Sequence, residues 1–473
     1  GRSWSYSEIS VHMTEPEASV LVAQVMPWSS GTPGKVSGEL IYAPIWPDGD
    51  ESNHGDMEVY AHRVDAYIAQ YQGKLKDKIV LLRNPGVHEE MSEPLFERYD
   101  EEELSELMKL PEPVAGLKND WFTAWPEDAD VEERFVDQLS TEIEADMENL
   151  RLRIRSRLHA FLRDEKPAAV FLVSGVGPGG SVYADNYASY HPDHATPPPS
   201  AIIMSEQYNR LVRLLARGVK VSASVNIKAQ FHQQNVDGLN VIATLPAKQK
   251  TEQTVMLGAH LDSWLGGTGA GDNAAGSAVV MEAMRILKVL DLPLQRNVTL
   301  ALWDGEEQNY YGSRGYVREH FADPISMALK PAHKNLFAYF NLDNGAGRIR
   351  GVYLEGNEGA RKMFEPWFKP LADLGVTTIT SRDTTYTDHR VFDSVGLPGF
   401  QFIQDGLDHE THTHHSNVDT YDRLIEEDLI QAATVMATVI YHAANSEQMM
   451  PRKALPKALP ARRPLPEILR PRN

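Results

Sequence analysis

Alternating apolar and polar residues predict β-structure at the beginning of the chain. The alternation covers residues 5–13 and 19–26 and ends in the sequence PWSSGTPGK, whose Pro, Gly and Ser residues favour turns. The apolar segments SGELIYAP and DKIVLLRNPG predict further strands downstream. The beginning of the chain is therefore expected to be rich in strands.

A long amphipathic helix is predicted over residues 131–162. Its apolar residues recur every three or four positions, as one face of a helix requires; they are Phe135, Leu139, Ile143, Met147, Leu150, Ile154, Leu158 and Phe161. The charged residues between them fit a face exposed to water.

From about residue 240 the pattern changes to strands that alternate with helices. The apolar segments TVMLGA, NVTLALW, LFAYFNL and GFQFI are separated by stretches of helix length, such as residues 273–290. This alternation predicts an α/β domain with a mainly parallel sheet. After residue 450, the sequence PRKALPKALPARRPLPEILRPRN is too rich in proline to continue a helix and predicts an extended tail.

Composition excludes several classes of protein. The 473 residues carry a net charge of −20 and include no cysteine, so the chain has no disulfide and no thiolate zinc site. The acidic balance argues against nucleic acid as a partner. No apolar run approaches the ~20 residues that a membrane helix needs. Because the first residue is Gly1, we expect the chain to be processed, trimmed or a fragment of a longer protein.

Acidic and histidine residues follow the predicted strands of the α/β domain. In open α/β sheets, ligands bind beyond the carboxyl ends of the strands. The five segments concerned therefore direct their side chains to one edge of the sheet; they contribute His260, Asp272, the pair Glu306 and Glu307, Asp343, and His415. Each residue alone has an ordinary structural explanation, such as a helix cap for Asp272. Together they bring several carboxylates close enough to repel one another, which a pair of metal ions would resolve.

The types of ligand indicate which metal this edge binds. Imidazole and carboxylate without thiolate suit zinc, with cobalt or manganese as alternatives. Two ions roughly 3.5–4 Å apart share a bridging carboxylate and a water, and such pairs catalyse hydrolysis. Of the adjacent Glu306 and Glu307, one can bind metal while the other takes the proton from the water. Asp262, two residues after His260, is placed to hold the second imidazole nitrogen.

These motifs resemble a known family. The sequences GAHLDSWLGGTGAGDNAAG, LWDGEEQNYYGSRGY, NLDNGAG and HHSNVDT are similar to those of the co-catalytic zinc exopeptidases related to bacterial leucine aminopeptidase, in particular the carboxypeptidase Q branch. The resemblance implies two zinc ions, with His260 and Asp343 on one and Glu307 and His415 on the other. It further implies that Asp272 bridges the two ions and that Glu306 is the general base and acid. His415 is chosen over His412 and His414 because it stands four residues before Asp419, as in the family motif.

The resemblance also implies an organisation of domains. Residues 1–34 would supply the first strands of the catalytic domain, and residues 35–228 would form an inserted protease-associated domain, rich in β-structure, with a helical segment at about 97–163. Residues 229–450 would form the catalytic domain, of the zinc exopeptidase fold with helices on both faces of the sheet, and residues 451–473 the tail. Family members carry helices before the first strand, and here the chain starts almost at that strand. Asp388, His389 and Tyr386 would line the substrate pocket, although Tyr386 equally fits a packing role.

The function implied is that of a zinc metallopeptidase that removes terminal residues from dipeptides or short peptides through a zinc-bridged water. Two alternatives stay open from the sequence. One is a single-zinc acyl transferase of the glutaminyl cyclase type, and the other is a metal-free binding or structural relative. The resemblance implies a secreted or periplasmic location and the ability to form a homodimer. Whether such an enzyme acts as an aminopeptidase, a carboxypeptidase or a strict dipeptidase depends on the shape of its pocket.

Overall fold

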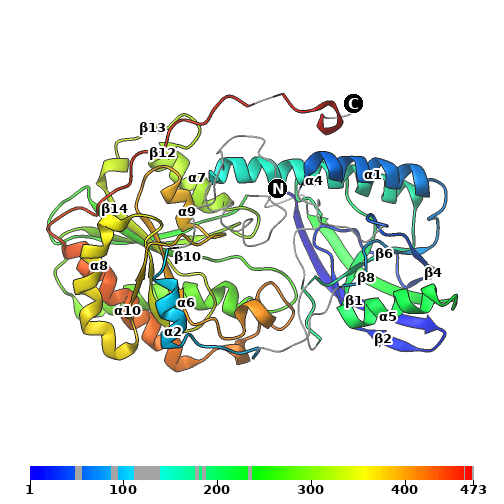
Figure 1. Ribbon diagram of the computed structural model, residues 1–473, viewed down its shortest axis with the longest axis horizontal. Coiled ribbons are helices and arrows are strands. Elements are labelled where there is room, and N and C mark those ends of the chain that lie inside the picture. Colours follow the sequence, from blue (N-terminus) through cyan, green and yellow to red (C-terminus); the bar gives the residue numbers. More distant parts are fainter. Residues whose placement is uncertain are drawn as a thin grey trace.

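The chain forms two domains that lie side by side, each built on one large sheet (Figure 1). This computed structural model describes residues 1–47, 56–86, 94–110, 139–175, 180–183, 188–232, 237–462 and 464–470. One sheet has seven strands and the other has eight, and a two-stranded hairpin of β12 (Ala322–Asp323) and β13 (Ala328–Leu329) stands apart.

The seven-stranded sheet has the order β16-β15-β17-β14-β10-β11-β9. Its central strands β17, β14, β10 and β11 are parallel, whereas β9 pairs antiparallel to β11 and β15 antiparallel to β17. This mainly parallel arrangement confirms the fold class expected from the sequence. The strands are β9 (Val241–Leu245), β10 (Thr254–His260), β11 (Asn297–Trp303), β14 (Leu336–Asn341), β15 (Ile349–Tyr353), β16 (Thr378–Thr380) and β17 (Gly399–Gln404).

Helices cover both faces of this sheet because alternate strand residues point to opposite sides. Leu257 and Phe340 face one core, which includes α6 (Ala275–Leu290), α8 (Arg361–Phe368) and α10 (Glu426–Asn445). Met256 and Tyr339, one position earlier on the same strands, face a second core with α7 (Tyr311–His320) and α9 (His389–Asp393). Both cores are closed to water, so the sheet is a rigid base for residues at its edge.

The eight-stranded sheet has the order β2-β1-β8-β4-β5-β6-β7-β3. Its strands are β1 (Ser3–Glu15), β2 (Ser19–Leu21), β3 (Ala23–Val25), β4 (Val36–Tyr42), β5 (Ile79–Leu81), β6 (Ala169–Val173), β7 (Ser200–Ile203) and β8 (Ser222–His232). The helices α1 (Met57–Tyr71) and α4 (Thr141–Glu165) pack on one face and α5 (Ser205–Ala216) on the other.

This sheet corrects the expectation that residues 1–34 add strands to the catalytic domain. β1 pairs with β8 along almost its whole length, from Ser3 opposite His232 to Glu15 opposite Ser222, and β3 pairs with β7. The alternating pattern identifies a strand, but it carries no information on which strand lies beside it.

The predicted helix over residues 131–162 corresponds to α4 (Thr141–Glu165). Residues 131–138 of that prediction lie outside the described part of the chain. α4 crosses from one domain to the other (Figure 1). At its first turn Glu142 forms ion pairs with Arg314 and Arg318, and Glu144 pairs with Arg390 at 2.6 Å. The short helix α2 (Glu101–Leu107) packs separately against β16 of the seven-stranded sheet.

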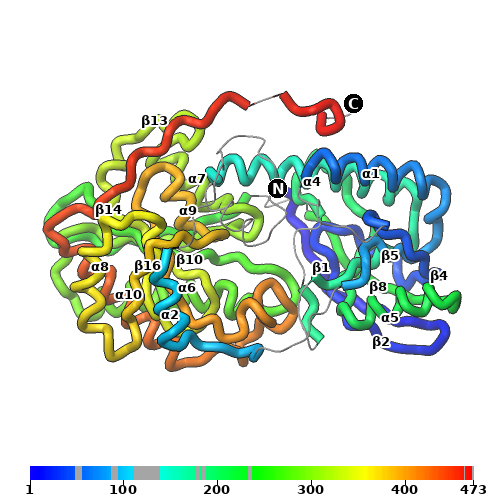
Figure 2. Tube along the Cα trace, in the orientation of Figure 1, coloured from blue at the N-terminus to red at the C-terminus, as the bar shows by residue number. Residues whose placement is uncertain are grey.

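The C-terminal segment connects the two domains over the surface, as its red trace in Figure 2 shows. Arg452 donates to the backbone carbonyl of Leu336, Arg462 pairs with Asp146 of α4, and Leu469 is buried in the core beside α1.

Among the described residues, no helix combines the length and apolarity needed to cross a membrane. The remaining short elements are η1 (Ala270–Ala274), η2 (His333–Asn335), η3 (Glu358–Ala360), η4 (Lys369–Leu374), η5 (His409–Thr413), η6 (Tyr421–Arg423) and η7 (Glu467–Leu469).

Candidate metal centre

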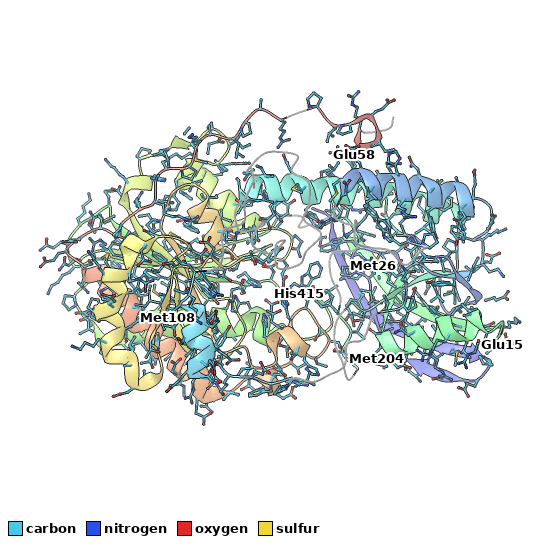
Figure 3. All side chains as sticks on the ribbon, viewed as in Figure 1. Glu15, Met26, Glu58, Met108, Met204 and His415 are labelled. Atoms are coloured by element: carbon cyan, nitrogen blue, oxygen red, sulfur yellow. The ribbon has the colours of Figure 1, made fainter. Side chains whose placement is uncertain are left out.

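The predicted metal ligands come together at the carboxyl edge of the seven-stranded sheet. His260 is the last residue of β10, Glu307 follows β11 and Asp343 follows β14. Asp272 lies in η1, immediately before α6, and His415 comes shortly after η5. Because β10, β11 and β14 are parallel neighbours, their carboxyl ends meet at one place. Figure 3 shows His415 in the region between the two domains.

The five side chains form two groups that share Asp272. His260 Nε2 lies 2.8 Å from Asp343 Oδ1 and 3.1 Å from Asp272 Oδ1. On the other side, His415 Nε2 lies 3.0 Å from Glu307 Oε2 and 3.3 Å from Asp272 Oδ2. The two oxygens of one carboxylate therefore face two different histidines, which is the arrangement of a bridging ligand.

The donor set fits a pair of zinc ions. Zinc binds imidazole nitrogen and carboxylate oxygen at about 2.0–2.2 Å, so two ligands of one tetrahedral ion lie about 3.3 Å apart. The nitrogen–oxygen distances of 2.8 to 3.3 Å agree with that separation. Within the described residues, Glu307 Oε1 is buried without a hydrogen-bond partner, as expected of an oxygen that faces a cation.

Burial and mutual repulsion act on the paired glutamates. Burial raises the pKa of Glu306 well above its usual range, and the carboxylate of Asp343 adds to this shift. Burial likewise raises the pKa of Glu307, with a further contribution from Asp272. Dications at this place would favour the ionised forms of all these groups, which is the electrostatic reason to expect them here.

Asp262 supports the centre in a way that differs from the sequence-based expectation. The backbone carbonyl of Asp262, at 2.9 Å, accepts the hydrogen bond from His260 Nδ1, whereas its carboxylate Oδ1 is 3.6 Å away from that nitrogen. The carboxylate instead accepts from the backbone N–H groups of Glu306 and Glu307, at 3.1 and 3.3 Å. Asp262 therefore fixes the loop that carries both glutamates.

Two further residues hold the ligands in place, and neither was assigned a contact from the sequence. The carboxylate of Asp419 accepts from the backbone N–H groups of Gly271 and Asp272, at 2.6 and 3.0 Å. The side-chain amide of Asn273 donates to Asp343 Oδ1 at 2.7 Å. The spacing of His415 and Asp419 in the motif HHSNVDT is the only sequence signal that points to this support.

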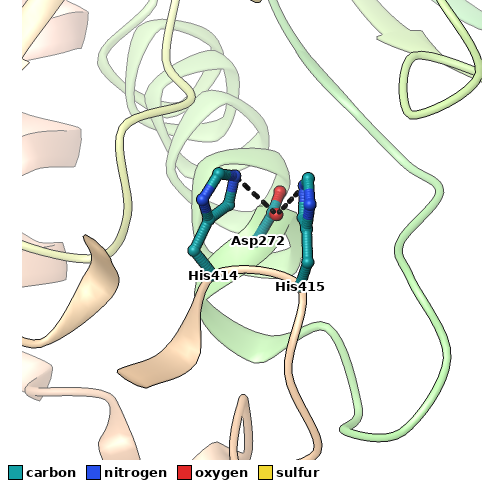
Figure 4. A group of neighbouring side chains, drawn as sticks. All are labelled: Asp272, His414 and His415. Carbon is teal, nitrogen blue, oxygen red and sulfur yellow. Dashed lines mark ion pairs between the residues drawn. The ribbon is translucent and has the colours of Figure 1, made fainter. Parts of the chain in front are cut away.

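Figure 4 compares the two adjacent histidines beside Asp272. His414 Nε2 lies 4.0 Å from Asp272 Oδ2, whereas His415 Nε2 lies 3.3 Å from it and also reaches Glu307. The geometry therefore favours His415 as the ligand, the choice made from the sequence. His414 directs its other ring nitrogen to Glu410, at 3.6 Å.

Comparison with known proteins identifies the domain that carries this centre. The model of peptidase family M28 matches residues 240–440. Because these residues are similar to peptidase family M28, the domain that contains them is called the M28 domain below.

Curated proteins similar to this chain agree with the expected resemblance. Carboxypeptidase Q of Homo sapiens and of Pongo abelii are each 30% identical to it over 254 residues, which is 54% of this chain and 51% of each relative. The chain thus spans about half the length of the curated relatives it matches. The aligned stretch confirms the similarity to carboxypeptidase Q expected from the motifs.

Solved structures show the same fold over both domains. The crystal structure of a peptidase M28 precursor from Shewanella amazonensis matches with a TM-score of 0.62 at 20% identity, over 96% of this chain and 84% of that one. The zinc aminopeptidase BSAP from Bacillus subtilis matches with a TM-score of 0.51 at 15% identity, over 95% and 86% of the two chains. At these identities the likeness concerns the fold alone.

The metal centre of the M28 domain opens into a cavity of about 840 Å³. The predicted ligands and Glu306 line this cavity, and Glu144, Arg151 and Arg155 of α4 line it as well. The second domain adds Tyr183. The cavity is therefore formed by both domains.

The predicted substrate residues differ in their position. Tyr386 lines the cavity and is 54% exposed. Asp388 and His389 are fully buried behind it and are absent from the lining, so the expectation that they line the pocket is corrected. Asp388 accepts a hydrogen bond from the hydroxyl of Ser313, and His389 Nε2 lies 3.2 Å from Glu355. Asp388 and His389 stand only two and three residues after the exposed Tyr386, and this closeness in the sequence misleads the prediction.

The buried Asp388 leads to a prediction about stability and pH. Burial raises the pKa of Asp388 to about 8, whereas that of the unfolded chain is about 3.9. The folded state therefore binds more protons between these values, and its stability falls as the pH rises through about 8. In the wild type, this group should lower the free energy of unfolding by on the order of 1 kcal/mol per pH unit between pH 6 and 8. Asp388→Asn should remove that contribution. Urea unfolding of the wild type and the variant at pH 6 and at pH 9 measures the free energy of unfolding of each. If the two proteins differed in this free energy by the same amount at both pH values, the expectation would be contradicted.

Tyr183 connects the second domain to the metal centre. Its hydroxyl lies 3.0 Å from His415 Nδ1, and Nε2 of the same ring faces Glu307 and Asp272. Groups that hold the second nitrogen of a ligating histidine commonly change metal affinity by about 10–100-fold. Tyr183→Phe should therefore weaken zinc binding by at least about 10-fold, as measured by competition with a chelator. Tyr190→Phe is the control, since the Tyr190 hydroxyl donates to the backbone carbonyl of Gln308 instead; equal losses in both variants would contradict the role of Tyr183.

Proposed function

We propose that this chain is a zinc exopeptidase that hydrolyses dipeptides or short peptides. The observation that carries the proposal is the position of Asp272, whose two carboxylate oxygens face His260 and His415 separately. One zinc ion would be held by His260 and Asp343 and the other by Glu307 and His415, with Asp272 shared. A carboxylate whose two oxygens face two separate groups of ligands fits a site with two ions. This geometry therefore favours the peptidase over the single-zinc acyl transferase.

Bound zinc would supply a Lewis acid for the peptide carbonyl and would make water a stronger acid. Glu306 is the side chain for the proton transfers, because it lines the cavity within 4.8 Å of His260 and Asp343, yet among the described residues it forms no ion pair with either ligating histidine. It would take a proton from the attacking water and give it to the leaving amine. Asp262 would keep Glu306 in position through the loop.

The second domain would restrict access to the cavity. We propose that it is the protease-associated domain expected from the resemblance, and that α4 forms the wall opposite the ligands. Three charged residues of α4 line the cavity, Glu144, Arg151 and Arg155, and ion pairs with the M28 domain hold the first turn of this helix. The same resemblance supports an extracytoplasmic location and a homodimer as proposals.

Hydrolysis of matched dipeptides tests the function. Free and N-acetylated forms of the same dipeptides are incubated with the protein, then with a chelator, and then with restored zinc. We expect cleavage of the free forms only, its loss with chelator and its return with zinc. Cleavage of the acetylated forms would indicate a carboxypeptidase or a deacylase, and no cleavage by protein shown to hold two zinc ions would contradict the proposal.

A further inference from the structure

A second group of metal-binding side chains lies on the wall of the same cavity. It consists of His409, Glu410 and His414, and all three line the cavity. His409 begins the π-helical turn η5 and His414 follows its last residue, where the backbone N–H of His414 donates to the carbonyl of His409 at 2.9 Å. This turn places both rings on one side, with their centroids 4.6 Å apart.

Glu410 faces both rings with different oxygens. Its Oε2 lies 3.6 Å from His414 Nδ1, and its Oε1 lies 3.8 Å from His409 Nε2. One ligand atom from each of the three side chains lies within 4.8 Å of the others. Two histidines and one glutamate are a common set of protein ligands for zinc.

The ring of His409 is a second observation that indicates a bound cation. The residue is 7% exposed, and among the described residues no hydrogen bond reaches either of its ring nitrogens. The buried nitrogen without a partner is Nδ1, and Nε2 is the nitrogen that faces Glu410, at 3.8 Å. Because no hydrogen bond holds this ring, its Nε2 is available to a cation beside Glu410 and His414.

The group is distinct from the proposed pair of zinc ions. His414 uses Nδ1 toward Glu410, whereas its Nε2 is turned to Asp272 at 4.0 Å. The two sites therefore lie on opposite sides of one ring. The side chain of Glu410 is 77% exposed, which contrasts with the buried ligands around Asp272. A charge that water also solvates binds a cation less strongly, so this group would fill only after the buried pair.

We propose that His409, Glu410 and His414 bind a third zinc ion, which inhibits the enzyme when zinc is in excess. The inhibition rests on the proposed function, whereas the binding does not. An ion held by these residues would occupy space in the cavity that Glu306 and the proposed zinc ligands also line, and that a peptide substrate needs. The chain would thus lose activity at zinc concentrations above those that fill the catalytic pair.

Counting zinc ions tests the binding independently of activity. The zinc-loaded protein is dialysed against increasing zinc chloride, and metal per chain is measured by mass spectrometry. We expect two equivalents at low zinc and a third at higher zinc for the wild type. Glu410→Gln and His409→Gln should keep two and bind the third at least about 10-fold more weakly. His412→Gln is the matched control, since His412 stands on the same turn but is outside the group.

Hydrolysis of a dipeptide in the same zinc series tests the inhibition. Wild type and His412→Gln should lose activity as the third equivalent binds, and Glu410→Gln should need at least about 10-fold more zinc for the same loss. A wild-type count that stays at two, or a third equivalent that survives in both Glu410→Gln and His409→Gln, would overturn the site. A third equivalent that leaves hydrolysis unchanged would overturn the inhibition. Protein with the third equivalent but without hydrolysis at any zinc concentration would contradict the proposed peptidase and leave the site established.

Discussion

Replacing Glu306 by glutamine is expected to lower kcat by about 10²–10⁴-fold while the protein keeps its zinc. Glutamine has nearly the same shape but cannot accept a proton from water. Glu306 lies within 4.8 Å of His260 and Asp343 but forms no ion pair with a histidine among the described residues, whereas its neighbour Glu307 lies 3.0 Å from His415. The change should therefore remove a proton transfer without removing a metal ligand.

Glu307→Gln is the natural comparison, because it changes the adjacent residue in the same way. This second variant should lose zinc as well as activity, since glutamine replaces an anionic ligand by a neutral one. Zinc content by mass spectrometry and steady-state hydrolysis of a free dipeptide distinguish the two variants. If Glu306→Gln hydrolysed peptides at near wild-type rates, or if it lost zinc as Glu307→Gln does, the roles assigned to the two residues would be wrong.

Replacing Asp272 by asparagine should remove activity and weaken the binding of both zinc ions by at least about 100-fold. Asp272 is the one side chain that both groups of ligands share, with Oδ1 toward His260 and Oδ2 toward His415. Asparagine keeps one oxygen, and its amide nitrogen, which donates hydrogen bonds, would face one of the two cations. The loss should therefore affect both ions, unlike the loss of a ligand to one of them.

Zinc titration of the metal-free proteins measures this effect. Asp304→Asn provides the control, because Asp304 also follows β11, yet its carboxylate accepts from the backbone N–H of Leu239 and does not line the cavity. Asp304→Asn should bind two equivalents like the wild type. An Asp272→Asn protein that still bound one equivalent tightly would show that Asp272 serves only one ion, and the bridging role would have to be abandoned.

The positions of the ligands were predictable because they depend on local sequence and on a general rule of α/β sheets. A strand that ends in His260 and a neighbouring strand that is followed by Glu306 and Glu307 must deliver these residues to the same edge. The structure brings His260, Asp272 and His415 together as that rule requires. Their roles as ligands stay a prediction that the two variants above test.

The supporting contacts were not predictable, because they depend on segments far apart in the chain. Tyr183 reaches His415 from the other domain, and nothing near Tyr183 in the sequence marks it. Asp262 was expected to hold an imidazole with its carboxylate, yet its backbone carbonyl does so. Spacing fixes which residues are near, but the rotation of a side chain depends on all the groups packed around it.

By itself, the sequence determined the types of element and the chemistry at the ends of the strands. Periods of two and of three to four residues follow from the geometry of strands and helices, so β10, α4 and the α/β alternation were readable. Only the tertiary structure decided that β1 pairs with β8 in the second domain, that α4 faces the metal centre, and that Asp388 is buried while Tyr386 is exposed. The physical reason is that the choice of a strand's neighbour and the burial of a loop residue depend on packing between distant segments, on which local periodicity carries no information.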